Sequence, residues 1–385
     1  MFNFTSLPPL SLYIHFPWCV QKCPYCDFNS HELKKNLDEK SYIDALISDL
    51  EQELPLFWGR SISSIFMGGG TPSLFSPESI DRLLSALRAR LTFAPNIEIT
   101  MEANPGTVEQ GKFIEFNAAG INRLSMGIQS FSDEKLKSLG RIHGRKQAIR
   151  AAELAHDAGF NSFNLDLMYG LPNQSIQQAV EDIETAIALE PSHISHYQLT
   201  IEPNTLFHYQ PPVTPDDDTL WEMQLACQSS LNRHNYLQYE ISAYAKKGYQ
   251  CQHNLNYWQF GDYLGIGAGA HGKISNANEQ SIIRSWKVKQ PQDYLNNAAT
   301  EKRISGKKTL TRHDAAFEFM MNALRLNNGF ETALFSKHTG LPISIIESAL
   351  KQAEQKNWIE WDIKHIRPTE KGSRFLNNLL ELFMP

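Results

Sequence analysis

Short hydrophobic runs alternate with amphipathic stretches from about residue 10 to residue 200. The runs are rich in β-branched and aromatic residues, which is typical of buried strands, and they lie at 11–16, 62–67, 97–102, 123–129, 163–168 and 194–200. Stretches between them, such as 176–189, place apolar residues on one helical stripe, as in a helix that covers a sheet. Six such units predict an α/β fold with an open, partial (β/α)6 barrel like part of a TIM barrel.

The pattern changes beyond about residue 310. Three helices are expected at 314–326, 331–338 and 344–356, followed by a hairpin of 358–361 with 365–367 and a last helix. This order predicts a small winged-helix-like domain. We therefore divide the chain into a barrel (1–210), a middle segment (211–309) and a C-terminal domain (310–385).

Composition and charge narrow the class of protein. The chain of 385 residues is 42% hydrophobic and 20% charged, as expected for a protein with a sizeable core. It contains 36 Lys and Arg residues and 42 Asp and Glu residues. The resulting net charge of -6 disfavours a nucleic-acid or anionic-membrane partner. With no signal sequence and no apolar run long enough for a transmembrane segment, we expect a cytoplasmic protein. A weak or transient contact with a membrane protein stays open.

Three cysteines follow the first predicted strand at CxxxCxxC spacing. Cys19, Cys23 and Cys26 lie on one short loop, so we expect their thiolates to converge on one metal centre. Structural zinc sites usually have four protein ligands, whereas the next candidate position here is Phe28, which offers none. This favours an iron–sulfur cluster with one open iron. A structural zinc site or a chance grouping of cysteines are the alternatives. The remaining Cys227 and Cys251 are expected to be buried thiols.

Strand alternation predicts which polar side chains face the barrel lumen. In 97–102 the apolar residues point toward the covering helices, and Glu98, Thr100 and Glu102 point the other way. The same alternation puts Gln129 and Asp166 on the polar side, near the ends of their strands. Sites in such barrels form at these strand ends, so we expect one shared cavity. Each residue could instead be a hydrogen-bonded polar group of the core.

A glycine run ends the second predicted strand. In Gly68, Gly69, Gly70 and Thr71 the lack of side chains would let backbone N–H groups approach a polar ligand, and Thr71 adds a hydroxyl. A simple turn is the alternative.

The motifs together resemble a known family. The cysteine spacing is similar to the signature of the radical S-adenosylmethionine (SAM) superfamily, and 68–72 resembles its GGGTP motif. Segments 102–105, 126–130, 140–143 and 166–172 resemble the oxygen-independent coproporphyrinogen III oxidases of that superfamily, over nearly the whole chain. The resemblance implies a [4Fe-4S] cluster beside two SAM molecules. The matching positions are Tyr13, Gly69 and Glu102 for the first SAM, and Gly70, Thr71, Gln129, Arg141, Asp166 and Thr200 for the second.

Two departures from the oxidases change the expected function. Oxidases have a further cysteine two positions after the third, where this chain has Phe28. Segment 253–258 resembles the HNxxYW signature of HemW-type haem chaperones, which are paralogues of the oxidases, and this implies a protein that binds haem and transfers it to an acceptor protein. His253 is then the expected axial haem ligand, with His271 as a second candidate. Coproporphyrinogen decarboxylation and a plain electron-transfer or scaffold role are the competing functions.

Overall fold

A single large sheet organises the molecule. The computed structural model describes residues 2–34, 36–107 and 110–384. Its strands are hydrogen-bonded in the order β14-β13-β12-β11-β1-β4-β5-β6-β7-β8-β10-β9. The six central strands are parallel: β1 (Leu10–Phe16), β4 (Ser61–Gly69), β5 (Thr92–Ala103), β6 (Arg123–Gln129), β7 (Phe163–Tyr169) and β8 (His193–Gln198). These strands match the six predicted runs and confirm the α/β fold with a partial barrel.

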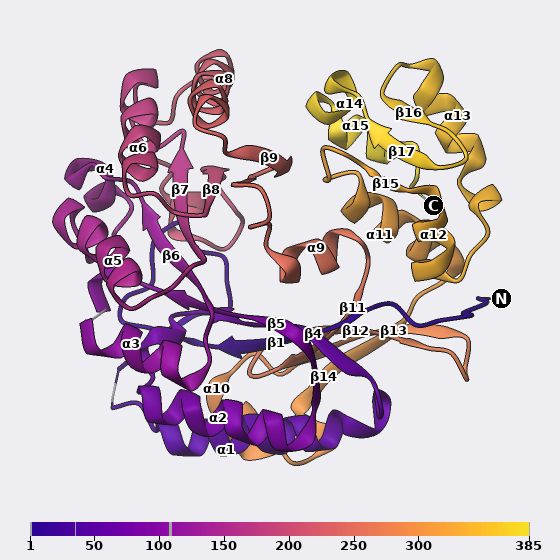
Figure 1. Ribbon diagram of the computed structural model, residues 1–385, viewed down its shortest axis with the longest axis horizontal. Helices are drawn as coiled ribbons and strands as arrows, with labels where there is room; N and C mark the ends of the chain where they lie inside the picture. Colours follow the sequence, from indigo (N-terminus) through magenta and orange to yellow (C-terminus); the bar gives the residue numbers. More distant parts are fainter. Residues whose placement is uncertain (1, 35, 108–109, 385) are drawn as a thin grey trace.

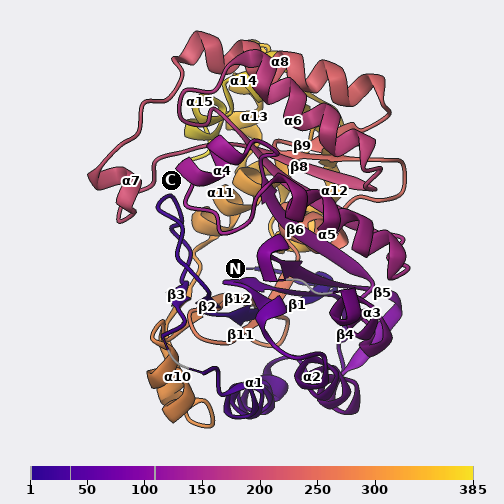
Figure 2. The same ribbon diagram turned by 90° about the vertical axis from the view of Figure 1, so that its left-hand side faces the viewer.

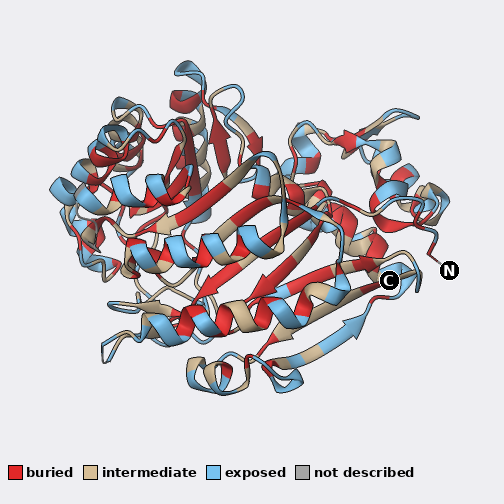
Figure 3. Ribbon diagram, turned by 60° about the horizontal axis from the view of Figure 1, so that its bottom comes forward, coloured by how far each residue is buried: buried red, intermediate tan, exposed pale blue. Residues whose placement is uncertain are grey.

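Helices cover the outer face of the curved sheet, while its concave side faces α9 and the C-terminal domain (Figures 1 and 2). The covering helices are α1 (Glu39–Glu53), α2 (Pro77–Arg90), α3 (Gln110–Ala119), α5 (Arg145–Asp157), α6 (Ile176–Ala188) and α8 (Asp217–Arg233). In α6, Ser175 and Gln178 form a capping box at the N-terminus, and Ile183 is buried on the face toward the sheet. Figure 3 shows the same division along the other helices, which are buried toward the strands and exposed outside.

The middle segment extends the barrel sheet at both edges. Strands β9 (Leu237–Glu240) and β10 (Ala243–Ala245) continue it beyond β8, and β11 (Asp262–Ile266), β12 (His271–Asn276), β13 (Ser281–Lys287) and β14 (Ile304–Thr309) continue it beyond β1. Helix α9 (Gln252–Trp258) connects the two edges across the concave side, and α10 (Pro291–Asn297) follows β13. The predicted segment 211–309 therefore shares the backbone hydrogen bonds of the barrel, which its own sequence pattern does not indicate.

A buried cluster of charges fastens α1 to the middle segment. The Lys287 ammonium lies 2.6 Å from an Asp49 carboxylate oxygen and 2.5 Å from one of Glu53. The Arg303 guanidinium lies 3.0 Å from Asp49 and 2.7 Å from Glu53, and the Tyr294 hydroxyl donates to Asp49. All five side chains are buried. Two cations and two carboxylates are thus buried together, and each charge is stabilised by the opposite charges next to it.

The C-terminal domain has its own core. It contains α11 (Arg312–Ala323), α12 (Thr332–Thr339), α13 (Glu347–Gln355), α14 (Glu370–Arg374), α15 (Leu376–Glu381) and the strands β15 (Phe330–Glu331), β17 (His365–Pro368) and β16 (Ile359–Trp361), in that spatial order. Phe319 packs edge-on against Phe330 and Phe335. The N-terminal Phe2 and Phe4 also belong to this core, a contact between the two ends of the chain that local pattern could not predict. None of the described helices has the length and apolar content needed to cross a membrane.

Candidate functional site

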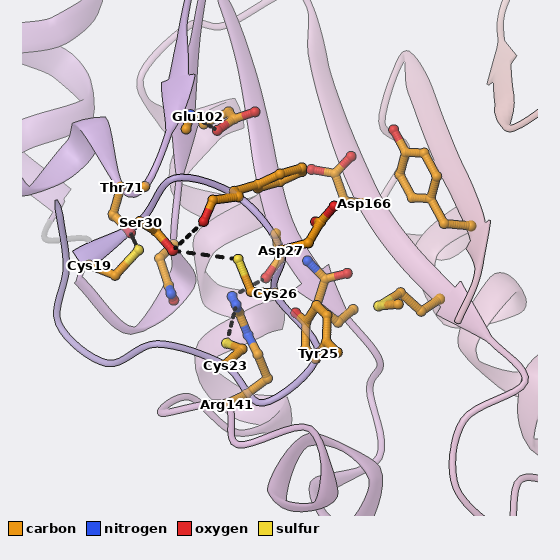
Figure 4. Close-up of a pocket in the computed structure, with 18 of the residues that line it drawn as sticks. Cys19, Cys23, Tyr25, Cys26, Asp27, Ser30, Thr71, Glu102, Arg141 and Asp166 are labelled. Atoms are coloured by element: carbon orange, nitrogen blue, oxygen red, sulfur yellow. Dashed lines mark hydrogen bonds between the residues drawn. The ribbon is translucent and has the colours of Figure 1, made fainter. Parts of the chain in front are cut away.

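A cavity of about 360 Å³ opens at the C-terminal ends of the central strands. The loop that carries the three cysteines forms one wall, and the ends of β4, β5, β6 and β7 form the floor and the opposite wall (Figure 4). This volume lies within the range of about 300–1,000 Å³ for small-molecule sites. Its lining includes Cys19, Cys23, Cys26, Gly69, Gly70, Thr71, Glu102, Gln129, Arg141, Asp166 and Thr200. Sequence analysis had placed all of these residues at the site.

The cysteine loop lies between the short paired strands β2 (Trp18–Cys19) and β3 (His31–Glu32). Its three thiols are free and half-buried, and each has a polar neighbour. The Thr71 hydroxyl donates to the sulfur of Cys19 at 3.6 Å, the Arg141 guanidinium donates to that of Cys23 at 3.5 Å, and Cys26 lies 3.6 Å from the Ser30 hydroxyl. Burial raises the pKa of the Cys19 thiol, and the hydrogen bond from Thr71 opposes this rise.

The same thiols do not form a site for a single ion. Among the described residues, no three side chains of His, Cys, Asp or Glu are grouped closely enough to hold one metal ion. A compact structural zinc site, which was the alternative to a cluster, needs such a group of ligands. The geometry of this part of the chain therefore disfavours zinc.

The glycine run packs the end of β4 against the cysteine loop. A Cβ atom on Gly70 would lie 2.4 Å from the carbonyl oxygen of Trp18 and 2.7 Å from that of Phe16, so only glycine fits there. The backbone N–H groups already have protein acceptors: Gly69 donates to Glu102, Gly70 to Phe16 and Thr71 to Trp18. This corrects the expectation that these N–H groups meet a ligand. Their role in the structure is to hold the loop close to the strand ends.

Two carboxyl groups lie on the floor of the cavity, as strand alternation predicted. Glu102 accepts a hydrogen bond from the Gly69 amide at 3.0 Å, and burial raises its pKa to about 8, with the negative charge of Asp166 adding to the shift. Asp166 accepts from Asn164 at 2.7 Å and from Ser125 at 3.1 Å. Burial raises the pKa of Asp166 as well, although these hydrogen bonds oppose the rise. Glu102 is thus poised to gain or lose a proton near neutral pH.

Gln129 and Arg141 reach the cavity from positions outside regular secondary structure: a register shift at the end of a strand and a loop after a helix. The pairing of β6 with β7 shifts register between Gly127 and Gln129, and Gln129 has φ of 70°. Arg141 comes from the loop after α4 (Asp133–Ser138), and its guanidinium donates to the Gly127 carbonyl at 2.7 Å as well as to Cys23. Sequence alone could not place this loop, and a solvated surface charge was the alternative. Arg141 instead joins the cavity floor to the cysteine loop.

Three residues expected at the cofactor sites do not line the cavity: Tyr13, His253 and His271. The Tyr13 hydroxyl lies 3.0 Å from Nδ1 of His15, and its ring packs near those of Phe66 and His253 below the cavity. Tyr13 therefore reaches the cavity only indirectly, because the His15 ring lies against Gly69.

His253 is enclosed in the lumen and has no free ring nitrogen. Its Nδ1 lies 3.0 Å from the Ser64 hydroxyl, its Nε2 lies 3.2 Å from the Tyr257 hydroxyl, and the residue is 1% exposed. Burial, with a smaller effect from the charge of Arg123, lowers the pKa of His253 to about 3. A haem iron would have to displace both hydroxyl partners to bind this ring, and the role of His253 as haem ligand stays a prediction.

Asn256 and Trp258 of the same segment also contact other parts of the protein. The Asn256 side chain donates to the hydroxyl of Ser11 and, at 2.8 Å, to the carbonyl of Asp262. The guanidinium of Arg325 lies over the Trp258 ring at 4.3 Å, which links α9 to the C-terminal domain. Helix α9 therefore closes the lumen beneath the cavity and positions the C-terminal domain.

His271 lies on the exposed end of β12, outside the cavity. Its ring stacks on Trp286 with centroids 6.2 Å apart. Partial burial and the charges of Arg284 and Lys289 lower the pKa of His271, which favours the neutral imidazole.

Sequence reasoning missed several lining residues. Ser125 lies two residues from Gly127 on the lumen face of β6, and Tyr197 comes from the end of β8. Strand alternation along β6 places Ser125 on the same face as Gln129, so this residue carries a signal in the sequence. Tyr25 and Asp27, from the cysteine loop, also line the cavity. Their positions depend on the path of the loop, which no periodic pattern encodes.

Comparisons with known proteins agree with this geometry. A sequence model of the radical SAM superfamily matches residues 13–186, and one of the HemN C-terminal domain matches residues 310–375. A protein of Escherichia coli (strain K12) named heme chaperone HemW is 51% identical over 379 residues, covering 98% of this chain and 99% of that protein. A protein of the same name from Haemophilus influenzae is 52% identical over 383 residues, covering 98% of this chain and 99% of that protein. The solved coproporphyrinogen III oxidase HemN of Escherichia coli has the same fold, with a TM-score of 0.82 at 24% identity over 98% of this chain and 90% of that one.

Proposed function

This chain belongs to the HemW family of radical SAM proteins, and from that premise we propose that it binds haem and transfers it to an acceptor protein. In this proposal the cavity holds a [4Fe-4S] cluster with SAM beside it.

The residues of the cavity fit a cluster and its SAM. Each cysteine of a cubane binds a different iron, so three thiols spaced along one wall suit a cluster better than a single ion. When bound, the cluster supplies an iron with an open coordination position. Arg141 suits a carboxylate of the ligand, and Glu102 and Asp166 suit its hydroxyl or cationic groups.

We favour haem transfer over decarboxylation mainly because of the relatives that this chain resembles most fully. Two full-length relatives that share about half of their residues with this chain are named heme chaperones, while the oxidase shares the fold at low identity. Phe28 supports the same choice. It lines the mouth of the cavity with 61% of its surface exposed, at the position where the oxidases carry their further cysteine. An exposed phenyl ring can contact an apolar macrocycle but cannot ligate iron.

The test compares two substrates on the anaerobically reconstituted protein. Added haem is expected to bind at about one per chain with a shifted Soret band, as for an iron with a protein axial ligand. Coproporphyrinogen III, supplied with SAM and a reductant, is expected to give no protoporphyrinogen IX by liquid chromatography. A known oxidase of the family serves as the positive control. Steady decarboxylation, or the absence of haem binding, would overturn the proposed function.

The two carboxyl groups lead to a prediction about SAM. Glu102 is mostly protonated at pH 7 because its pKa is about 8. SAM carries an ammonium and a sulfonium group, so its binding favours the ionised carboxylate. Its affinity should therefore rise with pH up to about 8, by up to about tenfold per pH unit. Equilibrium dialysis of SAM across this pH range measures the slope.

Glu102→Gln is the matched control for that slope. The amide keeps the shape of the side chain but cannot ionise, so SAM affinity should be lower and independent of pH. Asp166→Asn should also weaken SAM binding, while the iron content of both variants stays that of the wild type, because neither residue binds iron. An unchanged pH slope in Glu102→Gln would show that another group titrates.

The proposed function also includes a cellular location and the classes of partner that the protein binds. The excess of acidic residues in the whole chain, 42 against 36 basic ones, supports a protein that does not bind nucleic acid. We propose a cytoplasmic location, and a weak or transient contact with a membrane protein that accepts haem.

A further inference from the structure

A chain of hydrogen bonds runs from the cavity floor into the lumen of the barrel. It begins at Asp166 on β7, which lines the cavity (Figure 4), and an oxygen of this carboxylate lies 2.7 Å from the amide nitrogen of Asn164. His193 on β8 is the register partner of Asn164, and its Nδ1 lies 2.6 Å from the amide oxygen. The Nε2 of His193 lies 2.9 Å from the hydroxyl of Tyr239 on β9. Of these four residues, Asp166 alone lines the cavity.

The other end of the chain is fixed by the first turn of α9. The backbone N–H of Cys251, the N-cap residue of α9, donates to the Tyr239 hydroxyl at 3.3 Å. The Glu98 carboxylate holds this turn in place, because it accepts hydrogen bonds from the next two backbone amides at 3.1 and 3.0 Å. A backbone N–H group can only donate. The Tyr239 oxygen therefore accepts from Cys251, and the hydrogen of its own hydroxyl points to Nε2 of His193.

His193 is neutral in this environment. The residue is 1% exposed, and burial lowers its pKa well below the ordinary value, with the positive charge of Arg123 adding to the shift. A neutral imidazole has one ring hydrogen, so one nitrogen donates and the other accepts. Because Nε2 accepts from Tyr239, the hydrogen lies on Nδ1, which donates to the amide oxygen of Asn164.

The same direction continues to the carboxylate. With its oxygen turned toward His193, the Asn164 amide presents its nitrogen to Asp166 at 2.7 Å and to the Ser125 hydroxyl at 2.8 Å. The Ser195 hydroxyl donates to the amide oxygen at 3.1 Å, which supports this orientation. Each donor from the start of α9 onward therefore points toward Asp166. Hydrogen bonds aligned in this way polarise one another, and they favour a negatively charged acceptor at the end of the chain.

We propose that His193 and Tyr239 are positioning residues of the SAM site, which orient the Asn164 amide so that it holds the carboxylate of Asp166 for SAM. This inference rests on the proposed function, in which Asp166 contacts SAM. The chain transmits orientation because reversal of one group reverses the next. Without the Tyr239 hydroxyl, the ring hydrogen of His193 is free to lie on Nε2. The amide can then turn over, and its oxygen would face the carboxylate instead of its nitrogen.

SAM dialysis with the reconstituted full-length protein and its variants tests this role. Tyr239→Phe removes one hydroxyl and keeps the ring, and it is expected to raise the dissociation constant for SAM by about threefold to tenfold, as for one lost hydrogen bond. Tyr236→Phe is the matched control. Tyr236 is also buried, but its hydroxyl donates at 2.6 Å to the Pro191 carbonyl, outside the chain. This control should bind SAM as the wild type does.

Two substitutions of His193 separate positioning from packing. His193→Asn places a side-chain N–H where Nδ1 lies, whereas His193→Leu fills the space without a donor. We expect His193→Leu to raise the dissociation constant for SAM by about tenfold or more, and His193→Asn to stay within about threefold of the wild type. With a merely structural role, SAM affinity would instead follow the stability of each variant to urea. Iron content should be equal in all variants, because none of these residues binds iron.

The outcomes separate the positioning role from the proposed function. Absence of SAM binding by the wild type with a complete cluster would overturn both. Binding of SAM that Tyr239→Phe and His193→Leu leave unchanged would overturn the positioning role alone. Equal weakening in Tyr239→Phe and Tyr236→Phe would also overturn it, because loss of any buried hydroxyl would then have the same effect. If His193→Leu does not fold, this comparison of the two tyrosine variants decides.

Discussion

Replacing Cys23 by alanine is expected to abolish the cluster and the binding of SAM together. The three cysteines lie on one wall of the cavity, and a cubane that loses one protein ligand has two open irons beside solvent. Cys23 is also the sulfur that Arg141 contacts at 3.5 Å, so the variant loses a link between the loop and the cavity floor. Iron and sulfide analysis, the charge-transfer absorption and SAM dialysis after anaerobic reconstitution measure the effect.

Cys227→Ala is the matched control for this prediction. Cys227 is fully buried in α8 and does not line the cavity, so this variant should keep four irons per chain and wild-type SAM affinity. Four irons retained in Cys23→Ala would contradict the assignment of the cluster ligands. Loss of iron in both variants would mean that cluster content reports general damage to the fold.

Replacing Asp49 by alanine is expected to lower the free energy of unfolding by about 3–5 kcal/mol. Asp49 accepts from Lys287 at 2.6 Å and from Arg303 at 3.0 Å, and all three side chains are buried. Without it, two buried cations share the single carboxylate of Glu53, and desolvation of the second charge is no longer offset. Urea unfolding followed by circular dichroism measures the change.

Asp44→Ala provides the comparison on the surface of the same helix. Asp44 and Arg82 form an exposed ion pair, and such pairs contribute about 0–1 kcal/mol. If Asp49→Ala costs no more than Asp44→Ala, the buried cluster does not hold α1 to the middle segment. A concurrent loss of SAM binding is not expected, because neither residue lines the cavity.

Much of the site could be read from local pattern. The six barrel strands, the cysteine spacing and the lumen-facing Glu102 and Asp166 depend on the period of a strand and on short separations along the chain. Such features are set by neighbouring residues, so one sequence is enough to locate them. The resemblance to a family added Arg141 and Thr200, which lie in loops without any period, and both line the cavity.

Other features were decided by contacts between distant segments. The sequence by itself determined that residues 253–258 carry a histidine among aromatic residues, which is chemistry that suits a haem ligand. Only the tertiary structure decided that the Glu98 carboxylate would accept a hydrogen bond from the backbone amide of His253 at the start of α9. It also decided that the Ser64 hydroxyl would hydrogen-bond to the His253 ring. It also placed the exposed His271 beside the half-buried indole of Trp286. The physical reason is that burial and hydrogen-bond partners come from strands as far as 245 residues away along the chain, and no local period records that distance.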